Sequence, residues 1–400
     1  MKTRNMKTRN MKTRKVILSI LLCLVLFGMT GCNSETNATT SAPTSEATTT
    51  AAATSATTSA PESQPETSQK DGSGLIGAEY FTGNYTALPD NGETYQFTVS
   101  YAAPENSDAH TLMLAFKEAM EFYSDGKITL TLYPNGQLGS DAEMIASCLT
   151  GDIDFVMQSG STHVSFVPET AIFDTPFLLS GYDVEKIQEI ILDSEFRDMY
   201  NEANERGGLV CLMVKCVDTM NLTSNRAVYS VEDLKGLKIR TAQSESRMAF
   251  WSALGANPTP LAFSELYMAL QNGTVDAQDN VWANAVTSGA WEQQKYMIPT
   301  EHLRPSMDFT MGKEKFDSLP AEYQSFIKEI CANLNVMDFD TSIKTEQEYK
   351  TTLEGNLELC EVSDEFRQEM IEAAADSINK TRETVNNDAL YDTLERLLQN

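Results

Sequence analysis

The sequence predicts an α/β protein with enough apolar residues for a sizeable core. Strand-like and helix-like segments alternate from about residue 95 onward. The order strand, helix, strand implies parallel sheets with helices on both faces. The chain has 400 residues, of which 41% are hydrophobic, so one bilobal protein with tails fits its length. In sheets of this kind, ligands bind beyond the carboxyl ends of the strands.

The first elements are indicated by a change from period-two to helical spacing. YQFTVSYA at 95–102 alternates and is rich in β-branched and aromatic residues, which predicts a strand. A helix follows, with Asp108 as its expected cap and Asp125-Gly126 as its stop. The same patterns predict strands at 127–133, 153–158 and 209–215, and helices at 141–151 and 183–205.

The second half of the chain repeats these patterns. It predicts strands at 237–241 and 275–280, helices at 245–255 and 263–273, and one or two long helices at 320–353. Gly273 is a stop signal at the end of one of these helices.

The charge excludes several classes of partner. The formal net charge is −27, so the chain lacks the basic stripes that a nucleic-acid backbone requires. It also lacks a polybasic signal for an anionic membrane surface. Three histidines leave little room for a histidine-based zinc site, and no cofactor motif is present, so we expect neither a metal nor a cofactor.

The N-terminus has the pattern of a lipoprotein signal peptide. Basic residues precede an apolar run at 16–29, which is too short to span a bilayer comfortably and suits a signal peptide. The run ends in Met-Thr-Gly-Cys32, which resembles the lipobox of bacterial lipoproteins. That resemblance implies removal of residues 1–31 and lipidation of Cys32; the alternative is ordinary secretion with an incidental cysteine. Translation could start at Met1, Met6 or Met11.

A tether is expected between this anchor and the folded part. Residues 33–70 consist mainly of Thr, Ala and Ser and contain no aromatic residue and no Leu, Ile, Val or Met. Such a segment cannot bury enough apolar surface to order itself, so we expect a disordered tether over 32–93 and a folded domain over 94–400. We interpret the remaining cysteines as small buried hydrophobes rather than a disulfide framework: Cys148, Cys211, Cys216, Cys331 and Cys360.

Several blocks in order carry a family resemblance. LYPNGQLGSDAEMI, ETAIFDTPFLL, TSNRAVYSVEDLKGLKIRTAQS, LGANPTPLAFSELYMALQNGTVDAQDN and KYMIPTEH lie between about 95 and 345. The chain resembles the solute-binding proteins of tripartite ATP-independent periplasmic (TRAP) transporters, the DctP-like family. The resemblance implies a bilobal periplasmic-binding-protein-like fold, two α/β lobes that close over an organic acid and deliver it to a membrane permease. On this basis, lobe 1 should comprise about 94–217 and 306–345, and lobe 2 about 218–305 with C-terminal helices over 346–400.

Arg240 is the expected anchor for the ligand. It ends the LKIR strand, and a planar guanidinium suits bidentate capture of a carboxylate. The family motif implies this role at Arg240 and an amide contact at Asn280; a surface ion pair and a turn are the respective alternatives.

Further pocket contacts are expected at the strand ends. Phe263 matches an aromatic of the family pocket but could equally be a core residue, and Trp282 could stack on a sugar ring or cover the pocket. Gln158, Ser159 and Gln243 should face the cleft, whereas His302 is expected to be structural. The SNRA block aligns Met220 with a second arginine of several relatives, so we expect Met220 to contact the ligand, but a thioether puts a second charge contact in doubt.

Taken together, these features predict a lipid-anchored extracytoplasmic receptor, held at the membrane surface, for a C4-dicarboxylate or a sugar acid. Two alternatives remain: a ligand-sensing subunit for a receptor, and a cell-surface carbohydrate-active enzyme. The enzyme reading lacks support because no nucleophile elbow or phosphate-binding loop is present.

Overall fold

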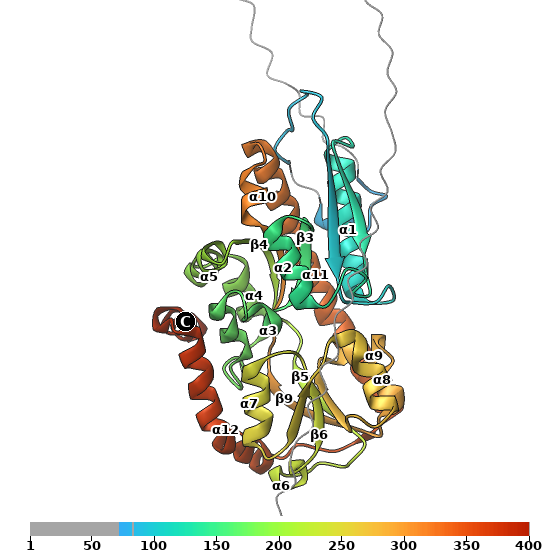
Figure 1. The fold of residues 1–400 in the computed structure, drawn as a ribbon, viewed down its shortest axis with the longest axis vertical. Coiled ribbons are helices and arrows are strands. Elements are labelled where there is room, and N and C mark those ends of the chain that lie inside the picture. Colours follow the sequence, from blue (N-terminus) through green and yellow to red (C-terminus); the bar gives the residue numbers. More distant parts are fainter. Residues whose placement is uncertain (1–71, 82–83, 400) are drawn as a thin grey trace, which may run out of the picture. The chain divides into compact units, whose positions relative to one another are not determined.

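The computed structural model describes residues 72–81 and 84–399 of the chain. These residues form two β-sheets with helices packed around each, shown as the upper and lower halves of Figure 1. We refer to the sheet that contains β1 and its helices as lobe 1, and to the sheet that contains β5 and its helices as lobe 2.

Lobe 1 is built on a five-stranded sheet in the order β2-β1-β3-β10-β4. β1, β2 and β3 are parallel to one another, whereas β10 is antiparallel to both of its neighbours. The strands are β1 (Tyr95–Tyr101), β2 (Ile128–Tyr133), β3 (Phe155–Ser159), β4 (Leu209–Lys215) and β10 (Met307–Gly312).

Lobe 2 is built on a six-stranded sheet in the order β11-β9-β5-β8-β6-β7. β6 is parallel to β7 and β8, and β5 is antiparallel to β8 and β9. The strands are β5 (Met220–Ser224), β6 (Lys238–Thr241), β7 (Asn257–Pro260), β8 (Ala277–Asn280), β9 (Tyr296–Leu303) and β11 (Glu358–Leu359).

The expected parallel pairing is found for β1 with β2 and β3 and for β6 with β7 and β8, but each sheet also contains antiparallel pairs, which the sequence did not predict. β5 follows β4 after a short crossing segment, and β10 follows β9 in the same way. Each crossing strand enters its sheet from the other lobe, so it runs against the strands that belong to right-handed strand-helix-strand units. The two crossings connect the lobes and lie side by side.

The helices cover both faces of each sheet. In lobe 1 they are η1 (Ala78–Tyr80), α1 (Asp108–Tyr123), α2 (Asp141–Thr150), α3 (Gly160–His163), η2 (Pro168–Asp174), α4 (Val184–Leu192), α5 (Glu195–Arg206) and α10 (Lys313–Asp317). In lobe 2 they are α6 (Val231–Leu234), α7 (Glu245–Ala253), η3 (Phe263–Glu265), α8 (Leu266–Gln271), α9 (Trp282–Thr287) and η4 (Ala290–Gln293).

Helix starts follow the capping residues of the sequence, with one correction. The cap of α1 is Ser107, whose hydroxyl accepts the His110 N–H at 3.2 Å, and not Asp108, which is the first helical residue. Ser140 caps α2 together with Glu143 in a reciprocal capping box. The predicted helix at 183–205 is split into α4 and α5 because Ser194 starts a new helix with its own side-chain cap.

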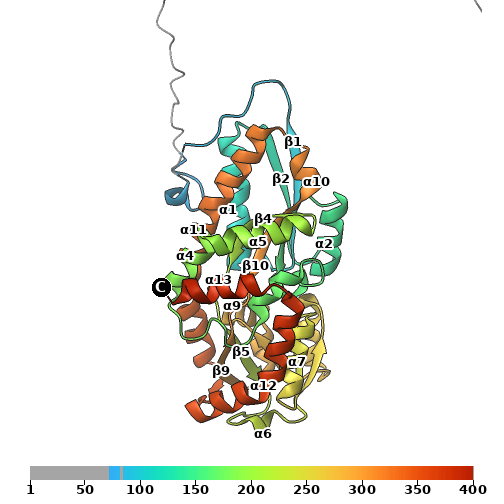
Figure 2. The ribbon, with the colours of Figure 1, turned by 90° about the vertical axis from the view of Figure 1, so that its left-hand side faces the viewer.

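Three C-terminal helices bind the two lobes together. α11 (Ala321–Glu354) is a single helix that packs against β4 and α1 of lobe 1 and against α9 of lobe 2. α12 (Asp364–Val385) packs on α7 and η2, and α13 (Asp388–Leu398) returns to α4 and α5 of lobe 1, as Figure 2 shows. The expectation that all residues of 346–400 belong to lobe 2 is therefore wrong for α13, whose apolar face is covered by lobe 1.

The expected tether over 32–93 was too long at its C-terminal end. Phe81 is buried in the lobe 1 core, and its carbonyl accepts a hydrogen bond from the Tyr123 hydroxyl. Thr86 donates to Glu329 through both its N–H and its hydroxyl, each at 2.6 Å. Sparse apolar residues among glycines and polar residues therefore suffice to hold this segment on α1 and α11.

The leader, the start of the tether and Cys32 lie outside the described residues. Within the described part of the chain, no helix is long and apolar enough to cross a membrane. The five cysteines of the folded part are all buried and free, which confirms their interpretation as small core residues.

Candidate functional site

A cavity of about 150 Å³ lies where the two lobes face each other, which on the scale of one water per 10–15 Å³ is room for roughly ten waters. Its walls are formed at the carboxyl ends of β1, β3, β6 and β8, with the starts of α1, α2, α7 and α9 and the crossing segments between the lobes. This is where α/β sheets bind ligands.

Arg240, at the end of β6, lines the cavity and is nearly buried. Its Nε and Nη2 atoms donate to the Leu261 carbonyl at 3.1 and 2.8 Å, which fixes the plane of the guanidinium. Its Cζ lies 5.9 Å from the centre of the Phe263 ring. Burial lowers the pKa of Arg240 to about 10, and Asp279 acts in the opposite direction. The group is still charged at neutral pH, and no carboxylate of the described residues forms an ion pair with it.

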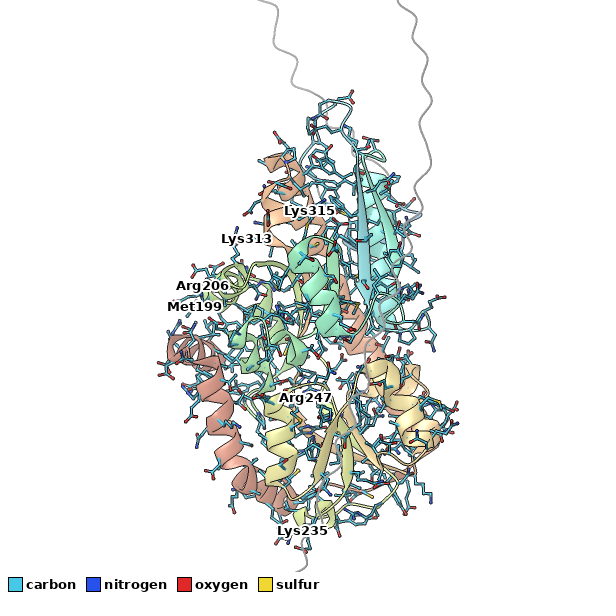
Figure 3. The ribbon with its side chains drawn as sticks, viewed as in Figure 1. Met199, Arg206, Lys235, Arg247, Lys313 and Lys315 are labelled. Carbon is cyan, nitrogen blue, oxygen red and sulfur yellow. The ribbon has the colours of Figure 1, made fainter. Side chains whose placement is uncertain are left out.

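A second guanidinium lines the same cavity and was missed from the sequence. Arg247 is on α7, and Figure 3 labels it in the region between the two sheets. Its Nη1 atom lies 3.7 Å from the Met220 sulfur. The sequence signal was a lone arginine in an apolar helix segment, ESRMAFW, and only the fold shows that it faces the Met220 position.

Arg247, unlike Arg240, is neutralised by the protein. Its Nε lies 3.2 Å from Asp174 Oδ1, and its Nη1 lies 3.9 Å from Asp279 Oδ2. Burial opposes ionisation of Asp279, but His302, Arg247 and Trp251 outweigh it, so the pKa of Asp279 is below its ordinary value. Burial lowers the pKa of His302 despite Asp279. His302 is thus part of a buried polar cluster beneath the cavity.

The family model of bacterial extracellular solute-binding proteins, family 7 (DctP), matches residues 99–384. The chain belongs to this family. Among curated relatives, the 2,3-diketo-L-gulonate-binding periplasmic protein of Escherichia coli is 30% identical over 225 residues, covering 56% of this chain and 68% of the relative.

Solved structures agree with this membership of the DctP family. A sugar acid binding protein from Advenella mimigardefordensis, in complex with galactonate, superposes with a TM-score of 0.72 at 26% identity, covering 76% of this chain and 99% of the other. A TRAP periplasmic solute-binding protein from Shewanella oneidensis, with bound succinate, gives a TM-score of 0.71 at 25% identity, covering 76% and 99%. The chain is therefore a bilobal, extracytoplasmic solute-binding protein of the DctP family.

Six of the eight ligand contacts expected for a DctP-family protein line the cavity. They are Arg240, Asn280, Ser159, Gln243, Phe263 and Met220. The Asn280 amide is held in place, since its Oδ1 accepts from the Val281 N–H and from Asn284 Nδ2, both at 3.0 Å. Asn284, one helical turn further along, also lines the cavity and was not expected from the sequence.

Gln158 and Trp282 do not line the cavity, contrary to expectation. Gln158 is fully buried in the sheet and hydrogen-bonds the Thr310 hydroxyl on β10 at 3.2 Å. Trp282 packs in a core cluster with Met297, Leu353 and Leu357, beneath α11. Neighbouring residues of a strand point to opposite faces, so Ser159 reaches the cavity only because Gln158 does not. At Trp282, the start of α9 turns the side chain toward α11.

The lobe 1 wall of the cavity is rich in carboxylates. Asp108, Asp141, Asp218 and Asp338 line it, together with Lys215. Lys215 Nζ lies 3.0 Å from Asp218 and 3.7 Å from Asp338. Within the described residues, no group of three or more His, Cys, Asp or Glu has an arrangement that could hold a metal ion.

Proposed function

We propose that this chain is the lipid-anchored receptor of a TRAP-type transporter, which captures an organic acid anion and delivers it to a membrane permease. The observation that carries the proposal is the buried guanidinium of Arg240, which lines a solute-sized cavity and forms no ion pair with a carboxylate of the described residues. A buried charge without a partner is costly, and a ligand carboxylate would supply the missing charge.

Known relatives support an acid as the ligand. The E. coli relative is named for 2,3-diketo-L-gulonate, and the two solved neighbours hold galactonate and succinate. These ligands share a carboxylate and are either sugar acids or a C4-dicarboxylate, which are the two classes that we propose for this chain.

In the proposed complex, the ligand carboxylate lies on Arg240, with the Asn280 amide beside it. Ser159, Gln243, Phe263 and Met220 surround the remainder of the ligand. The pocket is proposed to bind its solute without changing it, so we expect no enzyme activity; incubation with the bound acid should return it chemically unchanged.

Ligand binding is proposed to close the two lobes about the crossing segments. The segments between β4 and β5 and between β9 and β10 are short, so a rotation of one lobe can be absorbed there. A ligand that contacts both walls stabilises the closed form, which then docks on the permease. Small-angle scattering of the chain without and with ligand should show compaction, and an unchanged radius of gyration would contradict closure.

The membrane anchor is proposed to be Cys32, which lies outside the described residues. A Cys32→Ser variant expressed with its leader should leave the membrane fraction, whereas the wild-type chain should remain there and carry acyl groups by mass spectrometry. Wild-type protein that is soluble and unmodified would contradict lipidation.

Thermal unfolding of residues 33–400 against a panel of organic acids tests the receptor function, with neutral sugars and amino acids as controls. A ligand at 100 times its dissociation constant adds about 2.7 kcal/mol to the free energy of unfolding, which raises the midpoint by several degrees. We expect at least one acid to raise the midpoint and Arg240→Ala to remove the effect. A shift with neutral compounds alone would contradict the proposal.

A further inference from the structure

The two walls of the cavity carry opposite hydrogen-bonding chemistry. Lobe 2 presents the cation Arg240 and the amides of Asn280 and Asn284, each of which already donates one hydrogen bond within the protein. Lobe 1 presents four carboxylates and, among the described residues, one charged donor, Lys215. A ligand that bridges these walls is therefore favoured when it accepts hydrogen bonds from Arg240 and donates them to the carboxylates.

Three polar atoms of the acceptor wall have no partner among the described residues: Asp141 Oδ1, Asp338 Oδ2 and Ser306 Oγ. The side chain of Asp338 is only 6% exposed, and the nearby Ser342 hydroxyl does not complete a hydrogen bond to it. Ser306 is 3% exposed. Buried polar atoms are normally paired, so unpaired ones that line a ligand cavity point to donors on the ligand.

Asp141 is placed to contact the part of the ligand next to its carboxylate. One oxygen, Oδ2, accepts the Ser159 N–H at 3.1 Å, and this bond leaves Oδ1 unpaired. The positive charge of Arg240, on the other wall, is close enough to act on the Asp141 carboxyl group. Burial nevertheless raises the pKa of Asp141 to about 6, so the group is ionised at neutral pH and able to accept.

Besides Arg240, the described residues offer a second ligand carboxylate no cation in this cavity that lacks a protein carboxylate partner. Arg247 is occupied by Asp174 and Asp279, and Lys215 is occupied by Asp218 and Asp338. On the lobe 1 side the second carboxylate would meet Asp141 and Asp338, whose like charges repel it. An ionised dicarboxylate is therefore disfavoured.

We propose that the cavity selects a monocarboxylate that carries several hydroxyl groups, with its carboxylate on Arg240 and its hydroxyl groups donating to Asp141 and Asp338. This inference rests on the proposed function and narrows its two ligand classes to the sugar acids. Hydroxyl groups both donate and accept, so they also suit Lys215, which would repel a ligand ammonium. A site built to hydrogen-bond a hydroxyl group discriminates strongly against an analogue that lacks it.

Calorimetric titration tests the inference on residues 33–400, freed of bound solute by unfolding and refolding. The probes are D-gluconate and D-galactonate, with succinate as the dicarboxylate, glutamate as the amine-bearing acid and D-galactose as the neutral sugar. We expect at least one aldonate to bind at least about 100-fold more tightly than succinate and glutamate.

Each other outcome overturns a defined statement. Succinate binding as tightly as the aldonates would overturn the ligand class but leave the organic acid receptor intact. A preference for glutamate would overturn the inference, because the ligand donor would then be an ammonium group and not a hydroxyl group. Failure of both aldonates to bind would also overturn it. Binding of D-galactose without any acid would overturn the proposed function itself.

Variants of the acceptor wall give an independent test. Asp141→Asn keeps the shape and can still accept the Ser159 N–H, but it removes the negative charge. We expect Asp141→Asn and Asp338→Asn each to lower the aldonate-to-succinate affinity ratio at least about tenfold, because hydroxyl acceptance weakens and repulsion of succinate is relieved. The matched control is Asp152→Asn, an exposed residue of the same lobe, which should leave the ratio unchanged. If all three variants keep the aldonate-to-succinate affinity ratio of the wild-type protein, the inference is overturned.

Discussion

The two walls of the cavity differ in how their charges are balanced. On the lobe 2 wall, Arg240 has no ion pair with a described residue, whereas Arg247 is held by two buried carboxylates. On the lobe 1 wall, Lys215 is occupied by two carboxylates, while one oxygen each of Asp141 and Asp338 is left without a partner. The difference teaches that the number of charged groups in a site does not determine which ligand it prefers. The ligand preference depends on the charged groups that have no partner within the protein.

The largest expected effect comes from removing the unpaired cation. Arg240→Ala should weaken acid binding by about two to three or more decades, because an uncompensated buried carboxylate costs roughly 3–5 kcal/mol. Calorimetric titration measures the loss. The matched control is Arg226→Ala, which removes an exposed guanidinium of the same lobe and should leave the affinity unchanged. Near-wild-type affinity of Arg240→Ala would remove Arg240 from the site.

Removing Arg247, the cation that is paired within the protein, should lower the stability of the fold. Arg247→Met should lower the free energy of unfolding by about 3 kcal/mol, because Asp174 and Asp279 lose their shared counter-charge in a buried site. Urea unfolding of the ligand-free protein measures this change. An Arg247→Met protein that is as stable as wild type, yet binds no acid, would make Arg247 the ligand anchor and reverse the comparison.

The pH dependence of selectivity sharpens the description of the lobe 1 wall. Burial raises the pKa of Asp141 to about 6, partly opposed by the Ser159 N–H and Arg240. Burial also raises the pKa of Asp338 to about 6, opposed by Lys215 and assisted by Asp218 and Asp108. Above these values the carboxylates accept hydroxyl donors and repel a second carboxylate; below them both effects fade. The aldonate-to-succinate affinity ratio should therefore fall about tenfold between about pH 7.5 and about pH 5.

The control for this pH series is the double variant Asp141→Asn, Asp338→Asn. Succinate also titrates in this range, and its protonation relieves repulsion only where the wall is charged, so the difference between the two pH profiles reports the charge of the wall. The change of the aldonate-to-succinate affinity ratio with pH that is due to Asp141 and Asp338 should be absent from the double variant. A slope that is the same in both proteins would contradict the assignment to these two groups.

The smallest expected effect concerns a residue outside the cavity. Trp282→Phe should reduce the free energy of unfolding by about 1 kcal/mol, because it leaves space beside Met297, Leu353 and Leu357. Affinity for acids should stay within about twofold of wild type, since Trp282 does not line the cavity. A large loss of affinity without loss of stability would restore the stacking role that the sequence suggested.

Local sequence patterns were most informative for elements with a strong period. β4 and α11 lie within a residue or so of their predicted bounds, since an unbroken apolar run and a long periodic segment leave few alternatives. β5, β9 and β10 were not predicted from pattern alone. β5 and β10 are buried along nearly their whole length, so no polar–apolar alternation marks them, and β9 contains Pro299, which argues against a strand.

The residues of the candidate site also differ in how well the sequence predicted them. Motif blocks indicated Arg240 and Asn280, which follow strands and therefore lie at the edge where ligands bind. Gln158 was misplaced by a single residue of register, which in a strand means the opposite face. Arg247 was missed because a helical arginine gives no sign of which lobe surface it faces.

The sequence by itself determined the α/β class, the family and the anchor residue expected for a carboxylate. These follow from periodicity, strand-end positions and blocks of consecutive residues, all of which are local properties. Only the tertiary structure decided which charged groups are neutralised within the protein and which polar atoms of the cavity are left unpaired. Ion pairs such as Arg247 with Asp174 join residues of different elements, so the charge that remains for a ligand is a property of the packed fold.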